Sequence, residues 1–126
     1  MERRTVFSGS PYEDQYGYCR AVRVGEHIHV AGTTARDPDV DGADAYRQAR
    51  SALAIIERAL REAGSSLAAV VRTVTYLTDI DDFELVARAH REVFGQIRPA
   101  ATLVEVSRLV DPRLKVEIEA YAIDPS

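Results

Sequence analysis

Residues 98–122, RPAATLVEVSRLVDPRLKVEIEAYA, contain two segments of alternating character joined by a turn at Asp111-Pro112. Apolar residues that recur every second position are typical of strands with one buried face. The second segment has an aliphatic face made of Val116, Ile118, Ala120 and Ala122. Its other face mixes charged and apolar side chains: Lys115, Glu117, Glu119, Tyr121 and Ile123. The stretch therefore predicts two strands of a sheet whose second face is partly acidic.

This second face is too apolar for an ordinary solvent face and too charged for a dry core. We place Leu103, from the first segment, on the same face as Glu117 and Tyr121. A mixture of this kind fits a hydrated interface between subunits. A solvated sheet face is the alternative, and periodicity alone does not separate the two.

The rest of the chain predicts three further strands before a helix–strand–helix segment. A short edge strand, a hairpin, an amphipathic helix, a β-branched strand and a second amphipathic helix are expected at residues 3–8, 20–33, 44–64, 70–78 and 80–95. Residues 8–18, rich in Gly, Pro and Tyr, are expected to form a loop. Two helices with one apolar stripe each pack on one face of a sheet. The prediction is an α+β fold with a mixed sheet and the order βββαβαββ.

Length and composition limit the class of protein. The chain has 126 residues, 13.9 kDa and a net charge of −4, which fits one domain spanning residues 1–126. No basic run exceeds two residues, which argues against nucleic acid as a partner. With one cysteine, Cys19, no intramolecular disulfide forms. The N-terminus lacks the apolar core of a signal peptide and no stretch is long enough to span a membrane, so we expect a cytoplasmic protein.

Four stretches together resemble the Rid family, also called RidA or YjgF. They are YGYCRAVRVGEHIHVAGT, QARSALAIIERALREAGSSLAAVVRTVTYLTDIDDF, AHREVFG and RPAATLVEVSRLVDPRLKVEIEAYA, within residues 16–123. Each stretch alone is a weak signal, but the combination is specific. The resemblance implies a chorismate-mutase-like fold and a homotrimer with clefts between subunits. In active members of the family, the cleft hydrolyses reactive enamines and imines to carbonyl compounds and ammonia, with no metal or organic cofactor.

The resemblance also assigns roles to individual residues. The acid that positions the attacking water falls on Glu117, and the family's cleft residues fall on Tyr18, Gly32 and Thr33. The arginine that holds the substrate carboxylate falls on Ala101, which cannot do so. A charge-assisted contact of this kind is worth roughly 1.5–3 kcal/mol. This difference from the family puts the substrate in doubt.

Three arginines are candidates to replace the missing anchor: Arg98, Arg20 and Arg36. For each, a solvated surface side chain is the ordinary alternative. His90 lies on the apolar face of the second helix and is expected in the core or an interface. His27 and His29 form a His-x-His pair, but no carboxylate partner is implied nearby, so we expect no metal site.

Three functions remain open at this point. The first is a hydrolase of imines or enamines with altered substrate choice, whose catalytic residue is Glu117. The second is a non-catalytic trimer that binds a small ligand. The third, a ribonuclease or translation inhibitor, fits the acidic charge balance least well.

Overall fold

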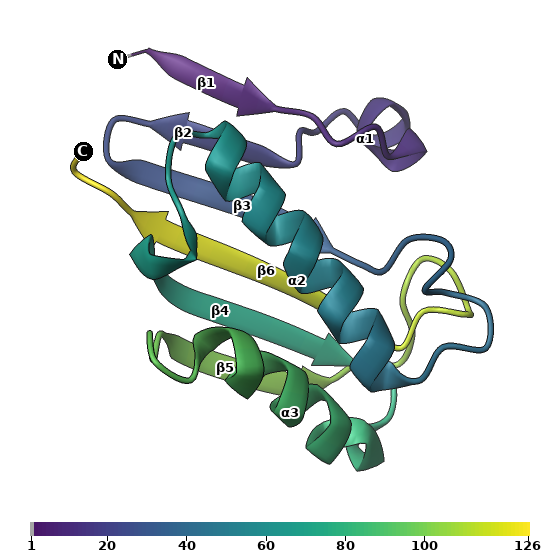
Figure 1. The fold of residues 1–126 in the computed structure, drawn as a ribbon. Helices are drawn as coiled ribbons and strands as arrows, with labels where there is room; N and C mark the ends of the chain where they lie inside the picture. The colour runs from purple at the N-terminus through teal and green to yellow at the C-terminus, as the bar shows by residue number, and fades with distance from the viewer. Residues whose placement is uncertain (1) are drawn as a thin grey trace.

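The computed structural model describes residues 2–126 as one six-stranded mixed sheet with two long helices on one face (Figure 1). The strands are β1 Arg3–Val6, β2 Ala21–Val24, β3 His27–Thr33, β4 Val70–Leu77, β5 Ala100–Glu105 and β6 Val116–Ile123. The helices are α1 Pro11–Tyr16, α2 Ala45–Glu62 and α3 Phe83–Phe94, with short 3₁₀ turns at Leu67–Ala69 and Ile80–Asp82. The predicted α+β class, strand order along the chain and helix-covered face are confirmed.

Neighbours in the sheet follow the order β1-β2-β3-β6-β4-β5. Strand β6 pairs antiparallel with both β3 and β4, so β3 and β4 run parallel to each other on either side of it. Helix α2 makes the crossover between them. Strand β5 pairs parallel with β4. The two strands of residues 98–122 are therefore not neighbours, because β4 lies between them.

The ends of both long helices follow from capping chemistry. The Asp44 side chain accepts from the backbone N–H of Arg47 at 2.9 Å, which satisfies a free donor at the start of α2. Beyond the end of α2, Gly64 has a φ of +82°, a left-handed conformation that favours glycine. Helix α3 ends before Gly95, whose N–H donates to Arg91 O at 2.8 Å.

The core lies between the sheet and the helices. The aliphatic face of β6 is buried, with Ile118 fully inaccessible, and it packs under α2. The facing side of α2 contributes Ala49, Leu53, Ile56 and Leu60, which are all buried. Burying a Leu or Ile side chain of this kind stabilises the fold by about 1.5–3 kcal/mol. The core therefore fixes which face of β6 is left for Glu117.

The predicted loop at residues 8–18 contains a helix, α1, so that prediction is wrong in part. The Ser10 hydroxyl accepts from Tyr12 N at 3.4 Å, and Pro11 occupies the first helical position. Gly17, with a φ of +83°, closes the turn. Ser, Pro and Gly are turn residues and also cap residues, and composition alone does not separate the two uses.

The placement of Leu103 on the acidic face is also wrong. In the β4–β5 register, Leu103 pairs with Thr75, which is 3% exposed and faces the helices. Leu103 packs against the core on that side. Leu103 and Val104 are both apolar, so alternation in this strand does not define the face, and a shift of one residue reverses it.

The uncovered face of the sheet carries aromatic and acidic side chains. Tyr121 stacks on His29 with ring centroids 4.7 Å apart, and its hydroxyl bonds to His27 Nδ1. Tyr76 donates to Glu119 at 2.6 Å. The two histidines of the His-x-His pair therefore contact a tyrosine. Within residues 2–126, no helix has both the length and the hydropathy needed to cross a lipid bilayer.

Candidate functional site

The six predicted site residues line two hollows on the surface. The first, which we call the Glu117 hollow, has a volume of about 660 Å³. It lies where β3, β6 and the segment around α1 meet, and its lining includes Tyr18, Arg20, Gly32, Thr33, Arg36 and Glu117. The structure thus brings together four predicted site residues that are far apart in the sequence.

Gly32 makes room for the Glu117 carboxylate. The register between β3 and β6 shifts between Val30 and Thr33, which is an irregularity typical of a β-bulge. A Cβ atom at position 32 would overlap Oε2 of Glu117. The carboxylate therefore lies directly over the Gly32 backbone, and any side chain there would displace it.

Glu117 is half-buried and its carboxylate has no hydrogen-bond partner among residues 2–126. Burial raises the pKa of Glu117; the nearby charge of Arg20 lowers it, and the charge of Glu119 raises it further, so the net shift is upward. A raised pKa brings a carboxyl group closer to the range in which it both takes and returns a proton. Glu119, two residues on, instead accepts from Tyr76.

Arg20 is the buried charge that organises this hollow. Its guanidinium donates to Gly32 O at 2.6 Å, to Thr33 Oγ1 at 3.1 Å and to the Tyr18 hydroxyl at 3.0 Å. It also pairs with Glu13 at 3.2 Å. Arg20 is only 3% exposed. Because its donors are occupied, Arg20 positions three site residues and is not free to hold a substrate carboxylate.

Glu13, in α1, links this helix to Arg20 and to Ser8. It is 4% exposed and accepts from Ser8 N at 3.0 Å, from the Ser8 hydroxyl and from Arg20. Burial alone would raise the pKa of Glu13, but the Ser8 hydrogen bonds and the Arg20 charge outweigh it and hold the pKa below its ordinary value. Arg36 donates to Ser8 O at 2.7 Å. Arg36 therefore also supports the N-terminal segment.

Tyr18 and Thr33 have different positions in the hollow. Thr33 is fully buried, and its hydroxyl donates to Ala31 O at 2.7 Å while accepting from Arg20. The Tyr18 ring is half-buried and lies 5.3 Å from the Arg20 guanidinium carbon. Tyr18 thus presents a ring to the hollow, whereas the Thr33 hydroxyl is used within the protein.

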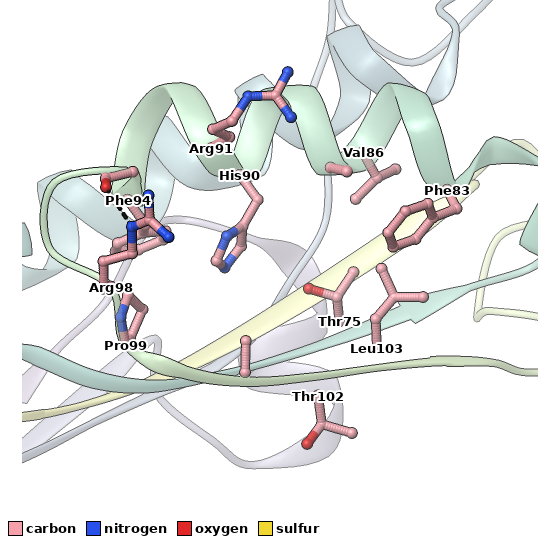
Figure 2. Close-up of a pocket in the computed structure, with 13 residues that line it drawn as sticks. Thr75, Phe83, Val86, His90, Arg91, Phe94, Arg98, Pro99, Thr102 and Leu103 are labelled. Atoms are coloured by element: carbon pink, nitrogen blue, oxygen red, sulfur yellow. Dashed lines mark hydrogen bonds between the residues drawn. The ribbon is translucent and has the colours of Figure 1, made fainter.

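The second hollow, which we call the His90 hollow, lies between α3 and β5 and has a volume of about 410 Å³ (Figure 2). Its walls are largely apolar: Phe83, Val86, Phe94, Pro99 and Leu103. Ala101 lines it from β5, and Thr102, the next residue, points away from it in Figure 2. This is the position at which the resemblance to the Rid family expects an arginine.

His90 projects from α3 toward β5 in this hollow (Figure 2). Its Nε2 bonds to Thr73 Oγ1 at 2.8 Å, and its ring packs on Phe94 with centroids 4.8 Å apart. Burial lowers the pKa of His90. His90 was expected in the core or an interface. It is partly buried and also lines a cavity.

Arg98 lies in the His90 hollow with Ala101. It is exposed, has a φ of 59°, and its Nε donates to Gly95 O at 2.8 Å. The side chain therefore folds back on the end of α3, as Figure 2 shows. An ion pair made by so exposed a side chain is worth only about 0–1 kcal/mol.

The predicted site residues thus divide into two groups that do not meet within one chain. Glu117, Tyr18, Gly32 and Thr33 line one hollow, and Ala101 and Arg98 line the other. The side chain of Ala101 is on the helix-covered side, in register with buried Thr73, whereas Glu117 alternates with the buried residues of β6. One ligand cannot contact both groups through the sheet.

The sequence did not predict the role of Glu13, and it did not predict that His90 lines a cavity. Glu13 falls in a segment predicted to be a loop, and nothing in its spacing marks it as a buried partner of Arg20. His90 was marked only by its place on an apolar helix face. Among residues 2–126, no three His, Cys, Asp or Glu side chains converge as metal ligands would.

Comparison with known proteins identifies the relatives of this arrangement. The model for the family described as endoribonuclease L-PSP, which is the YjgF/RidA family, matches residues 11–124. The chain belongs to the Rid family. The match includes both hollows, apart from Ser10 at the edge of the first.

Three Rid-family relatives show how far the likeness extends. An uncharacterized protein of Streptomyces coelicolor, SCO2049, is 40% identical over 94% of this chain and 91% of its own length. The human 2-iminobutanoate/2-iminopropanoate deaminase is 34% identical over 84% of this chain and 79% of its own. The crystal structure of Rv2704 from Mycobacterium tuberculosis, described as a YjgF/YER057c/UK114 family member, has a TM-score of 0.91 at 48% identity, covering 97% of this chain and 99% of that one.

Proposed function

We propose that this protein hydrolyses reactive imines or enamines to carbonyl compounds and ammonia, with Glu117 as the catalytic acid–base. The single observation that carries the proposal is the Glu117 carboxylate, half-buried over Gly32, without a hydrogen-bond partner among residues 2–126 and with a raised pKa. The human relative named as an iminobutanoate/iminopropanoate deaminase supports the same chemistry.

Imine hydrolysis needs a water molecule to add to the C=N carbon. The Glu117 carboxylate takes a proton from that water as the water oxygen bonds to carbon, and the protonated Glu117 returns this proton to the nitrogen. In the resulting carbinolamine, Glu117 takes the hydroxyl proton and returns it to the nitrogen as the C–N bond breaks, which releases ammonia and leaves the C=O product. Positioned proton transfer of this kind contributes about 10²- to 10⁴-fold in rate. No metal or organic cofactor is required by these steps.

The proposed active site is a cleft between protomers of a homotrimer. Glu117 and Ala101 face opposite sides of the sheet, so a cleft containing both requires the Glu117 hollow of one protomer and the His90 hollow of its neighbour. A closed cyclic assembly repeats such a head-to-tail contact at every interface. The proposal gives Tyr18, Gly32 and Thr33 to one wall, and Arg98 and Ala101 to the other.

The substrate is the second part of the proposal. Ala101 offers no cation to a substrate carboxylate, and losing such a contact costs about 10- to 150-fold in affinity. We therefore expect the preferred imines to differ from 2-iminopropanoate. The remaining alternative, a trimer that binds a ligand without catalysis, keeps the same cleft and differs only in turnover.

Ammonia release from freshly generated imines tests the proposal. An amino-acid oxidase in the assay mixture generates 2-imino acids in situ, and oxidation of amines generates imines without a carboxylate. Faster ammonia release with the protein than with buffer, for at least one of these, is the expected result. An intact trimer that accelerates none of them would leave the ligand-binding alternative. Cleavage of RNA by the purified protein, abolished by Glu117→Gln, would instead favour a ribonuclease.

A further inference from the structure

The side of the proposed cleft formed by α3 has a specific chemical character. Its walls are apolar, and the acids of the chain are absent from its lining within residues 2–126. The polar groups that remain are threonines, two arginines and His90. Of these side chains, His90 combines partial burial, a fixed orientation and a ring nitrogen without a hydrogen-bond partner among residues 2–126.

The orientation of His90 is fixed by two contacts. Thr73 Oγ1 bonds to Nε2 at 2.8 Å, and Thr73 is 1% exposed. The ring rests against Phe94, with planes inclined by 43°. The Thr73 hydroxyl can donate or accept, so it supports either tautomer of the neutral imidazole. Nδ1, which has no partner among residues 2–126, is then free to donate or to accept.

Burial favours the neutral form of this imidazole. It lowers the pKa of His90, and among residues 2–126 no carboxylate of the same chain lines the hollow. The charged groups that do line it, Arg91 and Arg98, are positive and exposed to solvent. A neutral ring cannot give a carboxylate the charge-assisted bond that an arginine gives.

We propose that His90 is a specificity-determining residue that binds an uncharged hydrogen-bonding group of the substrate, of the carboxamide type, in the space left by Ala101. The inference rests on the proposed function and names its substrate class: imines and enamines of uncharged carbonyl compounds. An amide both donates and accepts, which matches the two tautomers that Thr73 allows.

Arg91 and Arg98 do not change this assignment. Both are exposed, and the Arg98 Nε is bonded to Gly95 O. Exposed guanidinium groups are screened by water and contribute about 0–1 kcal/mol to a contact. A carboxylate entering the hollow would lose its hydration against Phe83, Leu103 and a neutral His90, without a buried cation to compensate.

Binding of two nearly isosteric probes, 2-oxobutanamide and 2-oxobutanoate, tests the inference without turnover. The experiment uses the full-length assembled protein, labelled with ¹³C and ¹⁵N in its three histidines. We expect 2-oxobutanamide to bind about tenfold more tightly, as one hydrogen bond allows, and to shift the His90 ring signals saturably. Equal affinities, tighter binding of 2-oxobutanoate, or unmoved His90 signals would overturn the assignment.

Three variants separate recognition from structural support. His90→Phe keeps a ring against Phe94 and should bring the affinity ratio close to one, whereas His90→Gln retains a neutral donor and acceptor and should preserve it. His29→Phe changes a histidine outside the hollow and should leave the ratio unchanged. A loosened fold lowers the affinity for both probes together, so it does not change the affinity ratio. A tenfold ratio that survives in His90→Phe would show that another group recognises the amide.

Failure of this inference and failure of the proposed function are distinguishable. Ammonia release from an imine, with equal binding of the two probes, would retain hydrolysis and reject the role of His90. A tenfold preference for 2-oxobutanamide, with no ammonia released from any imine, would retain the recognition and reject hydrolysis.

Discussion

Glu117 and Ala101 lie on opposite faces of one sheet, and strand β4 separates the strands that carry them. In a single protomer these two positions cannot share a ligand. The resemblance to the Rid family assigns both to one cleft. The two statements agree only if the cleft forms between protomers, and most of the predictions below depend on that geometry.

The first prediction concerns assembly. We expect a trimer of three times 13.9 kDa, because each cleft needs two protomers and a cyclic assembly leaves none unpaired. Light scattering on a size-exclusion column at micromolar protein measures the mass directly. A stable monomer would contradict both the assembly and the shared cleft.

The second prediction separates two acids on one face of β6. Glu117→Gln keeps the shape of the side chain but cannot take a proton, so imine hydrolysis should fall by about 10²- to 10⁴-fold. Glu119→Gln is the matched control, because Glu119 already accepts from Tyr76 and a glutamine oxygen can do the same. Its rate should change far less. Equal losses in two intact trimers would mean that the general charge of the face, and not Glu117, is responsible.

The third prediction is the pH dependence that follows from Glu117. Burial raises the pKa of Glu117 above the ordinary 4.5, and a general base works in its ionised form. The rate should therefore fall with decreasing pH at a value above that of an exposed glutamate. The free energy of unfolding has the opposite pH dependence. Ionising a group whose pKa is raised in the folded state costs free energy, so the contribution of Glu117 to stability is lost as pH rises through its folded pKa. Chemical unfolding of wild type and Glu117→Gln at several pH values measures this difference.

Much of the fold was predictable because each signal was local. The helix expected at residues 44–64 and the aliphatic face of β6 both follow from neighbouring residues, and both predictions were confirmed. The face of Leu103 was not predictable, since Val104 beside it is equally apolar. The helix α1 was missed because its Ser, Pro and Gly residues are as common in turns as in caps.

The residues of the site were predictable, but their separation onto two faces of the sheet was not. Family resemblance selected Glu117, Gly32 and Ala101 one by one, and a sequence does not state which face of a sheet each residue occupies. The Arg20–Glu13 pair was also beyond reach, because its partners come from α1 and from the segment before β2. Such pairs follow from the assembled fold and not from spacing.

The fourth prediction concerns that buried pair. Glu13→Ala leaves Arg20 buried without its carboxylate, and breaking such a pair typically costs about 3–5 kcal/mol. The pKa of Glu13 is held below its ordinary value, so its contribution is present near neutral pH and is lost as pH falls through the folded pKa. Urea unfolding at neutral and acid pH should show the difference shrinking in acid. Asp14→Ala, at the exposed next position, is the control and should change stability little.

The fifth prediction restores the missing cation. Ala101→Arg places a guanidinium in the His90 hollow and should raise the affinity for 2-oxobutanoate by about 10- to 150-fold. Thr102→Arg adds the same charge one residue on, where the side chain points away from the hollow (Figure 2), and should not do so. Calorimetric titration measures both. Tight binding of 2-oxobutanoate by the wild type would show instead that Arg98 already supplies the anchor.

The last prediction tests the shared cleft by mixing damaged protomers. Glu117→Gln removes the proposed acid from one wall, and Ala101→Trp fills the His90 hollow of the other wall, so each variant alone should be nearly inactive. In trimers reassembled from equal amounts of the two, an Ala101→Trp protomer can supply an intact Glu117 to the unfilled hollow of a Glu117→Gln neighbour. Random assembly makes about a quarter of the clefts intact in this way. The ammonia-release rate should recover to about that fraction of the wild-type value. Mixing Glu117→Gln with the double variant, which lacks Glu117 throughout, is the matched control and should recover nothing. If the first mixture also recovers nothing, although mass measurement confirms mixed trimers, the cleft is not shared between Glu117 and Ala101.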